Sequence, residues 1–473
     1  MRPAAIEERV RDYVEAERAQ IRVPPVMASR ILHAVEVSRR PAPRPPRLAF
    51  LRVAAAVAGV LLVGAGIAWV RTAQSPAGLA QGKWLPAPAM GVGRGYQTAT
   101  SLPNGKVLVV GGSQTNRILA STELYDPRTR SWSSAGTLTT PRSLHTATLL
   151  KNGKVLIVGG SNARPSSLGS LATAELYDPQ SNSWTLAASM HTPRSYHTAT
   201  LLADGRVLVV GGIEASNDVT GTVLASAELY DPLTNSWTPA APLPVARARH
   251  AAVLLADRRV LVIGGTDSEH LPSSSYFPTA ELYDPASQSW SLVASMNYAR
   301  VYATATLLPD NRVLVVGDDG VNERTAEVFD PRTNGWFPIP DPGVGRAEQV
   351  AVELTNGMVL VAGGVGETSA QLFDWRRNTW TSAGALSVIR ASATATVLVD
   401  GQVLIAGGFG NRSIPWASAE VYDPHGTSLV AARTSRPAPT PIAGALLFGI
   451  PALLLGLSAW LRRDRIVPET WID

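Results

Sequence analysis

The stretch AELYDPLTNSW, from Ala227 to Trp237, recurs along this 473-residue chain and decides its fold. Six copies of the stretch place a tryptophan seven residues after an aromatic residue, as Trp237 follows Tyr230. The seventh copy, AEVYDPHGTSL, ends on Leu429 at the tryptophan position. The missing tryptophan of this last copy is therefore the first question that the sequence raises.

A glycine pair precedes each copy at the end of an apolar run such as VLVVGG. The first glycines of these pairs follow one another at intervals of 44 to 53 residues: Gly111, Gly159, Gly211, Gly264, Gly317, Gly363 and Gly407. A repeat of this length is typical of a unit of four short strands. The sequence therefore predicts seven such units.

Each repeat also predicts how its four strands are connected. An alternating run such as HTATLL meets the VLVVGG run across Asn152 and Gly153, or across Asp204 and Gly205. Asn-Gly and Asp-Gly pairs favour the type I′ turn of an antiparallel hairpin. The Asp-Pro pair after the third run predicts a second turn, because proline presets φ and aspartate accepts a local backbone hydrogen bond.

The glycine pair, the aromatic residue and the tryptophan together resemble the kelch repeat, and the resemblance covers roughly 340 of the 473 residues. The departures are mild: Asp318 replaces one glycine, Phe329 and Phe373 replace tyrosine, and Trp375 replaces proline. The resemblance implies an all-β, seven-bladed β-propeller, with one repeat per blade and the first strand of each blade lining a central channel.

The segment GKWLPAPAM, residues 82–90, supplies the missing tryptophan. It matches NSWTPAAPL, residues 235–243, and places Trp84 in the tryptophan position. An open ring would leave unpaired strand edges, which propellers avoid. We therefore predict a propeller over residues 82–423 in which the N-terminal strand completes the seventh blade.

The amino-acid composition excludes several classes of function. The chain has no cysteine, which excludes disulfides, thiolate metal sites and cysteine nucleophiles. Its net charge of +5 resides in the tails, because residues 81–423 hold 25 Lys and Arg against 28 Asp and Glu. A slightly acidic domain lacks the basic surface that nucleic-acid binding requires.

Two apolar segments, without a charge over residues 53–70 and 441–461, flank the repeats and predict transmembrane helices at residues 49–70 and 441–461. Arginines before the first segment and after the second place both termini, residues 1–48 and 462–473, in the cytoplasm. A signal peptide for the first segment and a removable sorting signal for the second are the alternatives. Residues 71–81 and 424–440 then act as linkers, and the propeller lies outside the cytoplasm at the cell membrane, with the face of its third-to-fourth turns toward the bilayer.

The opposite face holds the candidate ligand-binding residues. An arginine precedes the first strand of every repeat: Arg94, Arg142, Arg194, Arg247, Arg300, Arg346 and Arg390. A ring of guanidinium groups could bind an anionic ligand bidentately. The alternative is that each arginine pairs with the glutamate of its own third strand, a series that only Gln371 interrupts.

Long loops in the second, third and fourth repeats form a second candidate surface, since specificity often resides in loops of uneven length on a rigid scaffold. The residues predicted to rim this surface are Asn217, Asp218, Glu269, His270 and Tyr276. Solvated loops without a ligand are the alternative interpretation.

No catalytic motif accompanies the repeats. The resemblance extends to galactose oxidase, whose radical cofactor needs a tyrosine cross-linked to cysteine, and this chain has no cysteine. His145, His197 and His250 share one repeat position, but equivalent positions around a ring do not readily converge on one metal ion. We therefore expect no cofactor, no metal and no enzymatic activity.

These observations predict a membrane-anchored module that binds a protein or glycan ligand. One alternative is a transmembrane signal transducer, in which the two short amphipathic helices predicted within residues 1–48 bind a cytoplasmic protein partner. The other is an extracytoplasmic sugar-active enzyme built on the same propeller.

Overall fold

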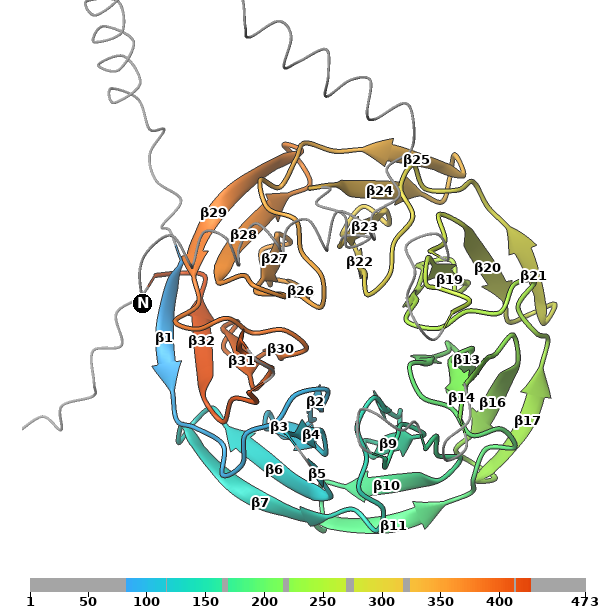
Figure 1. Ribbon diagram of the computed structural model, residues 1–473, viewed down its shortest axis with the longest axis horizontal. Helices are drawn as coiled ribbons and strands as arrows, with labels where there is room; N and C mark the ends of the chain where they lie inside the picture. Colours follow the sequence, from blue (N-terminus) through green and yellow to red (C-terminus); the bar gives the residue numbers. More distant parts are fainter. Residues whose placement is uncertain are drawn as a thin grey trace, which may run out of the picture. The chain divides into compact units, whose positions relative to one another are not determined.

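The computed structural model describes residues 82–115, 117–163, 169–215, 221–268, 276–317, 324–411 and 414–426. These residues form seven four-stranded antiparallel sheets arranged as blades around a central channel (Figure 1). The all-β, seven-bladed propeller expected from the repeats is therefore confirmed. Within the described ranges no helix is long and apolar enough to cross a membrane, and both predicted spans lie outside these ranges.

Each of the first six blades takes its four strands from one repeat, in the order from the channel outward. The first three blades are β2 (Thr98–Ser101), β3 (Val107–Val110), β6 (Ser121–Asp126) and β7 (Ser131–Thr137); β8 (Thr146–Leu149), β9 (Val155–Val158), β10 (Ala174–Asp178) and β11 (Ser183–Ala187); and β12 (Thr198–Leu201), β13 (Val207–Val210), β16 (Ala227–Asp231) and β17 (Ser236–Ala240).

The next three blades repeat this order with shorter loops between some strands. They are β18 (Ala251–Leu254), β19 (Val260–Ile263), β20 (Ala280–Asp284) and β21 (Ser289–Leu292); β22 (Thr304–Leu307), β23 (Val313–Val316), β24 (Ala326–Asp330) and β25 (Gly335–Pro338); and β26 (Val350–Glu353), β27 (Val359–Ala362), β28 (Ser369–Asp374) and β29 (Thr379–Ala385). Two small ladders stand beside the blades: β4 (Ser113–Gln114) with β5 (Arg117–Ile118), and β14 (Ile213–Glu214) with β15 (Thr222–Val223).

The seventh blade joins the two ends of the repeat region. Its strands are β30 (Thr394–Val397), β31 (Val403–Ala406), β32 (Ala419–Asp423) and β1 (Lys83–Ala87), and β1 is its outermost strand (Figure 1). Trp84 lies opposite Tyr422, and Lys83 lies opposite Asp423. The predicted closure by the N-terminal strand is confirmed, and the chain enters and leaves the propeller side by side.

The core lies between neighbouring blades, and the second strand of every blade is its centre. All four residues of these strands are buried, which explains why they read as continuous apolar runs rather than alternating ones. The aromatic residue of each third strand packs on the tryptophan of the fourth, with ring centroids 4.9 to 5.1 Å apart. Each blade therefore carries one aromatic pair at its outer edge.

Each tryptophan also links its blade to the preceding one. The seven indole N–H groups donate to a main-chain carbonyl of the previous blade at 2.7 to 2.9 Å, and Trp84 donates to Ala383 O in the same way. A cluster of buried side chains, including Val107, Tyr125 and Leu404, fills the seam between the seventh and first blades. The seam is therefore built like every other interface between blades.

The glycine pairs allow neighbouring blades to approach closely. Gly111 and Gly112 have φ of 58° and 99°, a conformation that favours glycine. A Cβ atom on Gly111 would lie 2.4 Å from Arg142 O, and Gly112 N donates to the same oxygen at 2.9 Å. The glycine pair thus marks the point where the main chain of the next blade is bound.

The inner hairpins differ from the predicted type I′ turns. Gly153 has φ of +83°, but Asn152 is not in the left-handed region. Gly153 N donates to Leu150 O at 3.0 Å, and Leu150 N donates to Lys154 O at 2.8 Å. This is a type I turn followed by a glycine bulge, a three-residue loop in which only the glycine needs positive φ. Asn152 Oδ1 is used instead to accept from Lys154 N, which fixes the turn from inside.

Candidate functional site at the channel mouth

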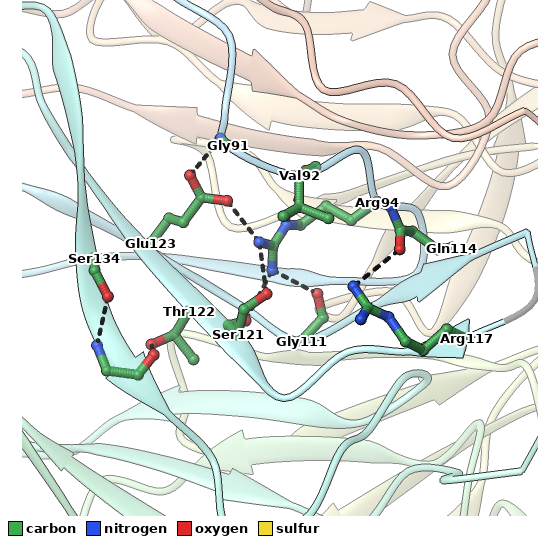
Figure 2. Close-up of polar contacts among 11 residues, drawn as sticks. Gly91, Val92, Arg94, Gly111, Gln114, Arg117, Ser121, Thr122, Glu123 and Ser134 are labelled. Atoms are coloured by element: carbon green, nitrogen blue, oxygen red, sulfur yellow. Dashed lines mark hydrogen bonds and ion pairs between the residues drawn. The ribbon is translucent and has the colours of Figure 1, made fainter.

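The seven arginines are buried between the loops of their own blades rather than exposed at the channel mouth. At most 3% of the surface of each is exposed. Arg94 Nη2 lies 2.6 Å from Glu123 Oε1, and Arg94 Nη1 donates to Gly111 O and Ser121 O (Figure 2). The second carboxylate oxygen of Glu123 accepts from Gly91 N at 2.7 Å. This clamp therefore holds together the loop that enters the blade, the glycine pair and the third strand.

The same pair of arginine and glutamate is present in six blades, although Glu281 Oε2 in the fourth blade accepts no hydrogen bond from the described residues. The remaining pairs, at 2.5 to 3.0 Å, are Arg142 with Glu175, Arg194 with Glu228, Arg247 with Glu281, Arg300 with Glu327, and Arg390 with Glu420. The pairing of these arginines with glutamates, stated above as the alternative to ligand binding, is thus what the structure shows. A ligand at the mouth would have to displace a buried ion pair to contact any of these six guanidinium groups, so their burial does not support ligand binding.

The sixth blade is the exception that Gln371 predicts. Arg346 contacts no carboxylate within 4.0 Å among the described residues, and its Nη atoms donate to Gly363 O, Ser369 O and Ser369 Oγ. Burial lowers the pKa of Arg346, and the charge of Glu367, which accepts from Ser369 Oγ, opposes this change. Arg346 therefore lacks the partner of the other arginines but is not open to a ligand, because only 3% of it is exposed.

The three histidines of the shared repeat position line the channel wall. Nε2 of His145, His197 and His250 lies 2.9 to 3.1 Å from a threonine hydroxyl of the preceding blade, and the glutamines at the same position in the first and sixth blades reach a main-chain carbonyl there. Burial and the neighbouring arginine lower the pKa of His197 and of His250 to about 3. These histidines are therefore neutral links between blades, and no group of three or more metal-binding side chains occurs among the described residues.

The long-loop candidates fall mainly outside the described residues. Asn217, Asp218, Glu269 and His270 lie in ranges that the structure does not describe. Tyr276 is described and forms an isolated bridge with Thr266 on the side of the arginine loops. The loop surface therefore stays a prediction.

A ring of seven other residues surrounds the channel mouth, and the sequence interpretation missed it. Each follows its blade's arginine by two positions, and all seven have φ between 51° and 57°: Tyr96, Leu144, Tyr196, Arg249, Tyr302, Glu348 and Ser392. We call these residues the channel-mouth ring. With the adjoining wall positions they line a hollow of about 330 Å³ to which all seven blades contribute.

Main-chain hydrogen bonds hold the channel-mouth ring in place. The N–H of one ring residue donates to the carbonyl of the ring residue in the preceding blade at six of the seven junctions, with lengths from 3.0 to 3.4 Å. A left-handed conformation is uncommon for residues other than glycine and requires support from the surroundings. The ring is therefore a rigid frame on which the side chain can change without altering the main chain.

The side chains of the ring form two contrasting groups. The guanidinium of Arg249 lies 4.3 Å from the ring centroid of Tyr196, and Arg249 Nε donates to Tyr302 Oη at 2.8 Å. On the other side of the mouth, Glu348 accepts from Ser392 Oγ at 2.5 Å and from Tyr96 Oη at 3.4 Å. The mouth therefore presents aromatic surfaces, a stacked cation and a carboxylate, which is the mixture of groups that binding sites use for specificity.

A signal for this ring exists in the sequence, although no fixed motif does. The ring residue stands between the arginine and the His, Gln or Ala of the channel wall, as in RGYQ (94–97), RSYH (194–197) and RAEQ (346–349). The flanking positions repeat while the ring position varies in size, charge and polarity. The signal in the sequence is therefore a variable residue two positions after each arginine, between neighbours that repeat from blade to blade.

Comparisons with known proteins agree with the fold. The family profile "KLHDC2/KLHL20/DRC7 Kelch-repeats domain" matches residues 96–318. The chain is 29% identical over 195 residues to beta-scruin of Limulus polyphemus, covering 38% of this chain and 20% of that protein. It is 31% identical over 206 residues to Kelch-like protein 25 of Xenopus tropicalis, covering 42% of this chain and 34% of that protein. The matched region thus spans a fifth to a third of the length of these relatives.

A solved structure shares the architecture. A fungal alcohol oxidase of the AA5 family, in complex with copper, superposes with a TM-score of 0.59 at 19% identity and covers 73% of this chain and 76% of that one. At this identity the likeness concerns the fold alone. Together with the seven four-stranded sheets, the sequence matches support a kelch-repeat β-propeller, a fold that suggests a protein-interaction module.

Proposed function

We propose that this chain is a membrane-anchored, non-catalytic binding module that takes a protein or glycan ligand at the channel mouth. The observation that carries the proposal is the channel-mouth ring, in which seven main-chain positions of one conformation present five different kinds of side chain to a ligand. Fixed scaffolds with variable side chains at one end are typical of recognition surfaces. The Kelch-like names of the relatives support binding rather than catalysis, whereas the oxidase neighbour shares only the fold.

The proposed ligand contact can be tested by photo-crosslinking on intact cells. A benzophenone amino acid at Tyr96 places the reactive group in the channel-mouth ring, whereas the same group at Leu233 lies in the turn between β16 and β17 on the opposite face, where 93% of the side chain is exposed. We expect discrete adducts from Tyr96 alone, identified by mass spectrometry with and without glycosidase treatment. Equal adducts from both positions, or adducts from Leu233 only, would contradict binding at the mouth.

The proposed location outside the cytoplasm rests on the two apolar segments and on the arginines that flank them. Because the chain has no cysteine, a single introduced cysteine is the one site in the purified chain that a maleimide labels. We expect Leu292→Cys, on the outer strand β21 with 67% of its side chain exposed, to react with a membrane-impermeant maleimide on intact cells. Ser38→Cys is the matched cytoplasmic position and is expected to react only after lysis; the reverse pattern would contradict the proposed orientation.

A further inference from the structure

A groove beside the channel mouth, over the first, sixth and seventh blades, has a volume of about 610 Å³, which is within the usual range for ligand sites. We call it the rim groove. It shares Tyr96 and Glu348 with the hollow at the mouth, so the two spaces meet at these residues. Its other principal residues are Gln114, Val365, Ile389 and Phe409.

One charged side chain lines the rim groove in the described part of the chain, and it is Glu348. Two of the about four lone pairs of this carboxylate are used, by Ser392 Oγ and by Tyr96 Oη, so the carboxylate can accept further hydrogen bonds. None of the ion pairs formed by the described residues includes Glu348. Arg117, close to the groove, donates instead to Gln114 Oε1 at 3.2 Å (Figure 2).

The walls of the rim groove are apolar next to this carboxylate. Val365 leaves 59% of its surface exposed, and Phe409 and Ile389 are half-buried beside it. Phe409 also packs on Tyr96, with ring centroids 5.2 Å apart, and both rings line the groove. An exposed apolar surface that ends on one carboxylate matches a side chain with an aliphatic stem and a cationic head.

We infer that the rim groove binds a lysine side chain from an extended segment of a partner protein, with the ammonium group on Glu348 and the stem along Val365 and Phe409. The inference rests on the proposed function and narrows its ligand class to a protein. Charge complementarity carries it: the other charged residue of the channel-mouth ring, Arg249, is stacked between Tyr196 and Tyr302, whereas Glu348 has no cationic partner among the described residues.

Fluorescence anisotropy with the purified full-length chain tests this inference. The probe is the pentapeptide Gly-Gly-Lys-Gly-Gly with a neutral fluorophore, compared with the same peptide carrying acetyl-lysine or norleucine in place of lysine. Norleucine keeps an apolar stem without the charge, and acetyl-lysine keeps the length without the charge. We expect the lysine probe to bind about tenfold more tightly than either, a difference of about 1.4 kcal/mol, which is close to the contribution of one hydrogen bond to a charged group. The preference should shrink as salt is added.

Two variants assign the effect to the groove. Glu348→Gln is expected to reduce binding of the lysine probe to the level of the norleucine probe. Glu214→Gln removes the same charge from an exposed residue on the same face in the third blade and is expected to leave the preference intact. Equal binding of the three probes, an unaffected Glu348→Gln variant, or an equal loss in both variants would overturn the inference. If crosslinks from Tyr96 persist in that case, the channel mouth still binds a ligand and only the lysine subsite is refuted.

Discussion

The hairpin between the first and second strands of every blade contains one residue in the left-handed main-chain conformation, and in the fourth blade this residue is Arg258. Five hairpins have glycine at this position, with φ from 81° to 97°, but the fourth blade has Arg258 at 74° and the fifth has Asn311 at 68°. The left-handed conformation costs a residue with a Cβ atom about 1–2 kcal/mol, while asparagine tolerates it better. The fourth hairpin is therefore under local strain that glycine would relieve.

We expect Arg258→Gly to raise the free energy of unfolding by about 0.5–1 kcal/mol, since relief of the strain exceeds the entropy that glycine loses on folding. Asn311→Gly is the matched change and should give a smaller gain. Urea unfolding of both variants measures the difference. A loss of stability in Arg258→Gly would mean that the arginine side chain contributes more than its conformation costs.

The buried histidines predict a response to acid. The pKa of His197 and that of His250 are lowered to about 3, and the pKa of His145 is also lowered. These histidines therefore stay neutral in the folded chain at mildly acidic pH, whereas in the unfolded chain they bind protons below about pH 6.5. Their effect on stability is absent above pH 6.5 and grows as the pH falls toward 3. The free energy of unfolding should therefore drop by roughly 1–2 kcal/mol per histidine between pH 7.5 and 5.0.

Glutamine provides the control for this effect, because Gln97 and Gln349 occupy the histidine position in two blades and donate to a carbonyl of the preceding blade. The combined variant His145→Gln, His197→Gln, His250→Gln is expected to lose less stability over the same pH interval. Identical pH dependence of the two proteins in chemical unfolding would show that carboxylates, and not these histidines, cause the acid response.

At the level of the elements, the clamp of arginine and glutamate explains why six of the seven blades begin alike. In the fourth blade, Arg247 Nη2 lies 2.5 Å from Glu281 Oε1, and neither side chain is exposed. Removal of one partner from a buried ion pair leaves an uncompensated charge, which costs about 3–5 kcal/mol. The clamp is thus a device for holding the loop at the channel mouth against the third strand.

Two opposite changes test this role. Glu281→Gln is expected to lower the free energy of unfolding by about 3–5 kcal/mol, because it leaves Arg247 without a carboxylate. Gln371→Glu supplies the carboxylate that Arg346 lacks and is expected to raise the free energy of unfolding by about 1–3 kcal/mol. Calorimetric or urea unfolding at low and high salt measures both. A destabilising Gln371→Glu would indicate that Glu367 already compensates Arg346 through Ser369.

The strands and their order could be predicted from sequence, but parts of the site could not. The continuous apolar runs and the glycine pairs depend on local periodicity, which one sequence displays seven times. The type of the inner turn could not be read, because Asn152-Gly153 fits both a type I′ turn and the observed type I turn with a glycine bulge. The channel-mouth ring could not be predicted, because Tyr96, Arg249 and Glu348 have the same main-chain conformation but chemically different side chains.

For the propeller as a whole, the seam between β1 and β32 decides whether seven blades form a closed ring. Trp84 packs on Tyr422 with ring centroids 5.1 Å apart and donates to Ala383 O at 2.7 Å, which joins the seventh blade to the sixth. Trp290 makes the corresponding contacts in the fourth blade, with Tyr283 at 5.0 Å and Ala241 O at 2.8 Å. The seam therefore has the same local contacts as an interface inside the chain, but nothing covalent holds β1 against β32.

This equivalence makes a final prediction. Trp84→Ala and Trp290→Ala should each lower the free energy of unfolding by roughly 2–4 kcal/mol, because each removes a packed indole and its hydrogen bond. The two variants should differ in a second respect, since only Trp84→Ala weakens the attachment of β1 and leaves β32 as an exposed strand edge that can pair with another molecule. We therefore expect concentration-dependent association of Trp84→Ala in light scattering and none for Trp290→Ala. Unchanged stability of Trp84→Ala beside a destabilised Trp290→Ala would show that the ring does not depend on its N-terminal strand.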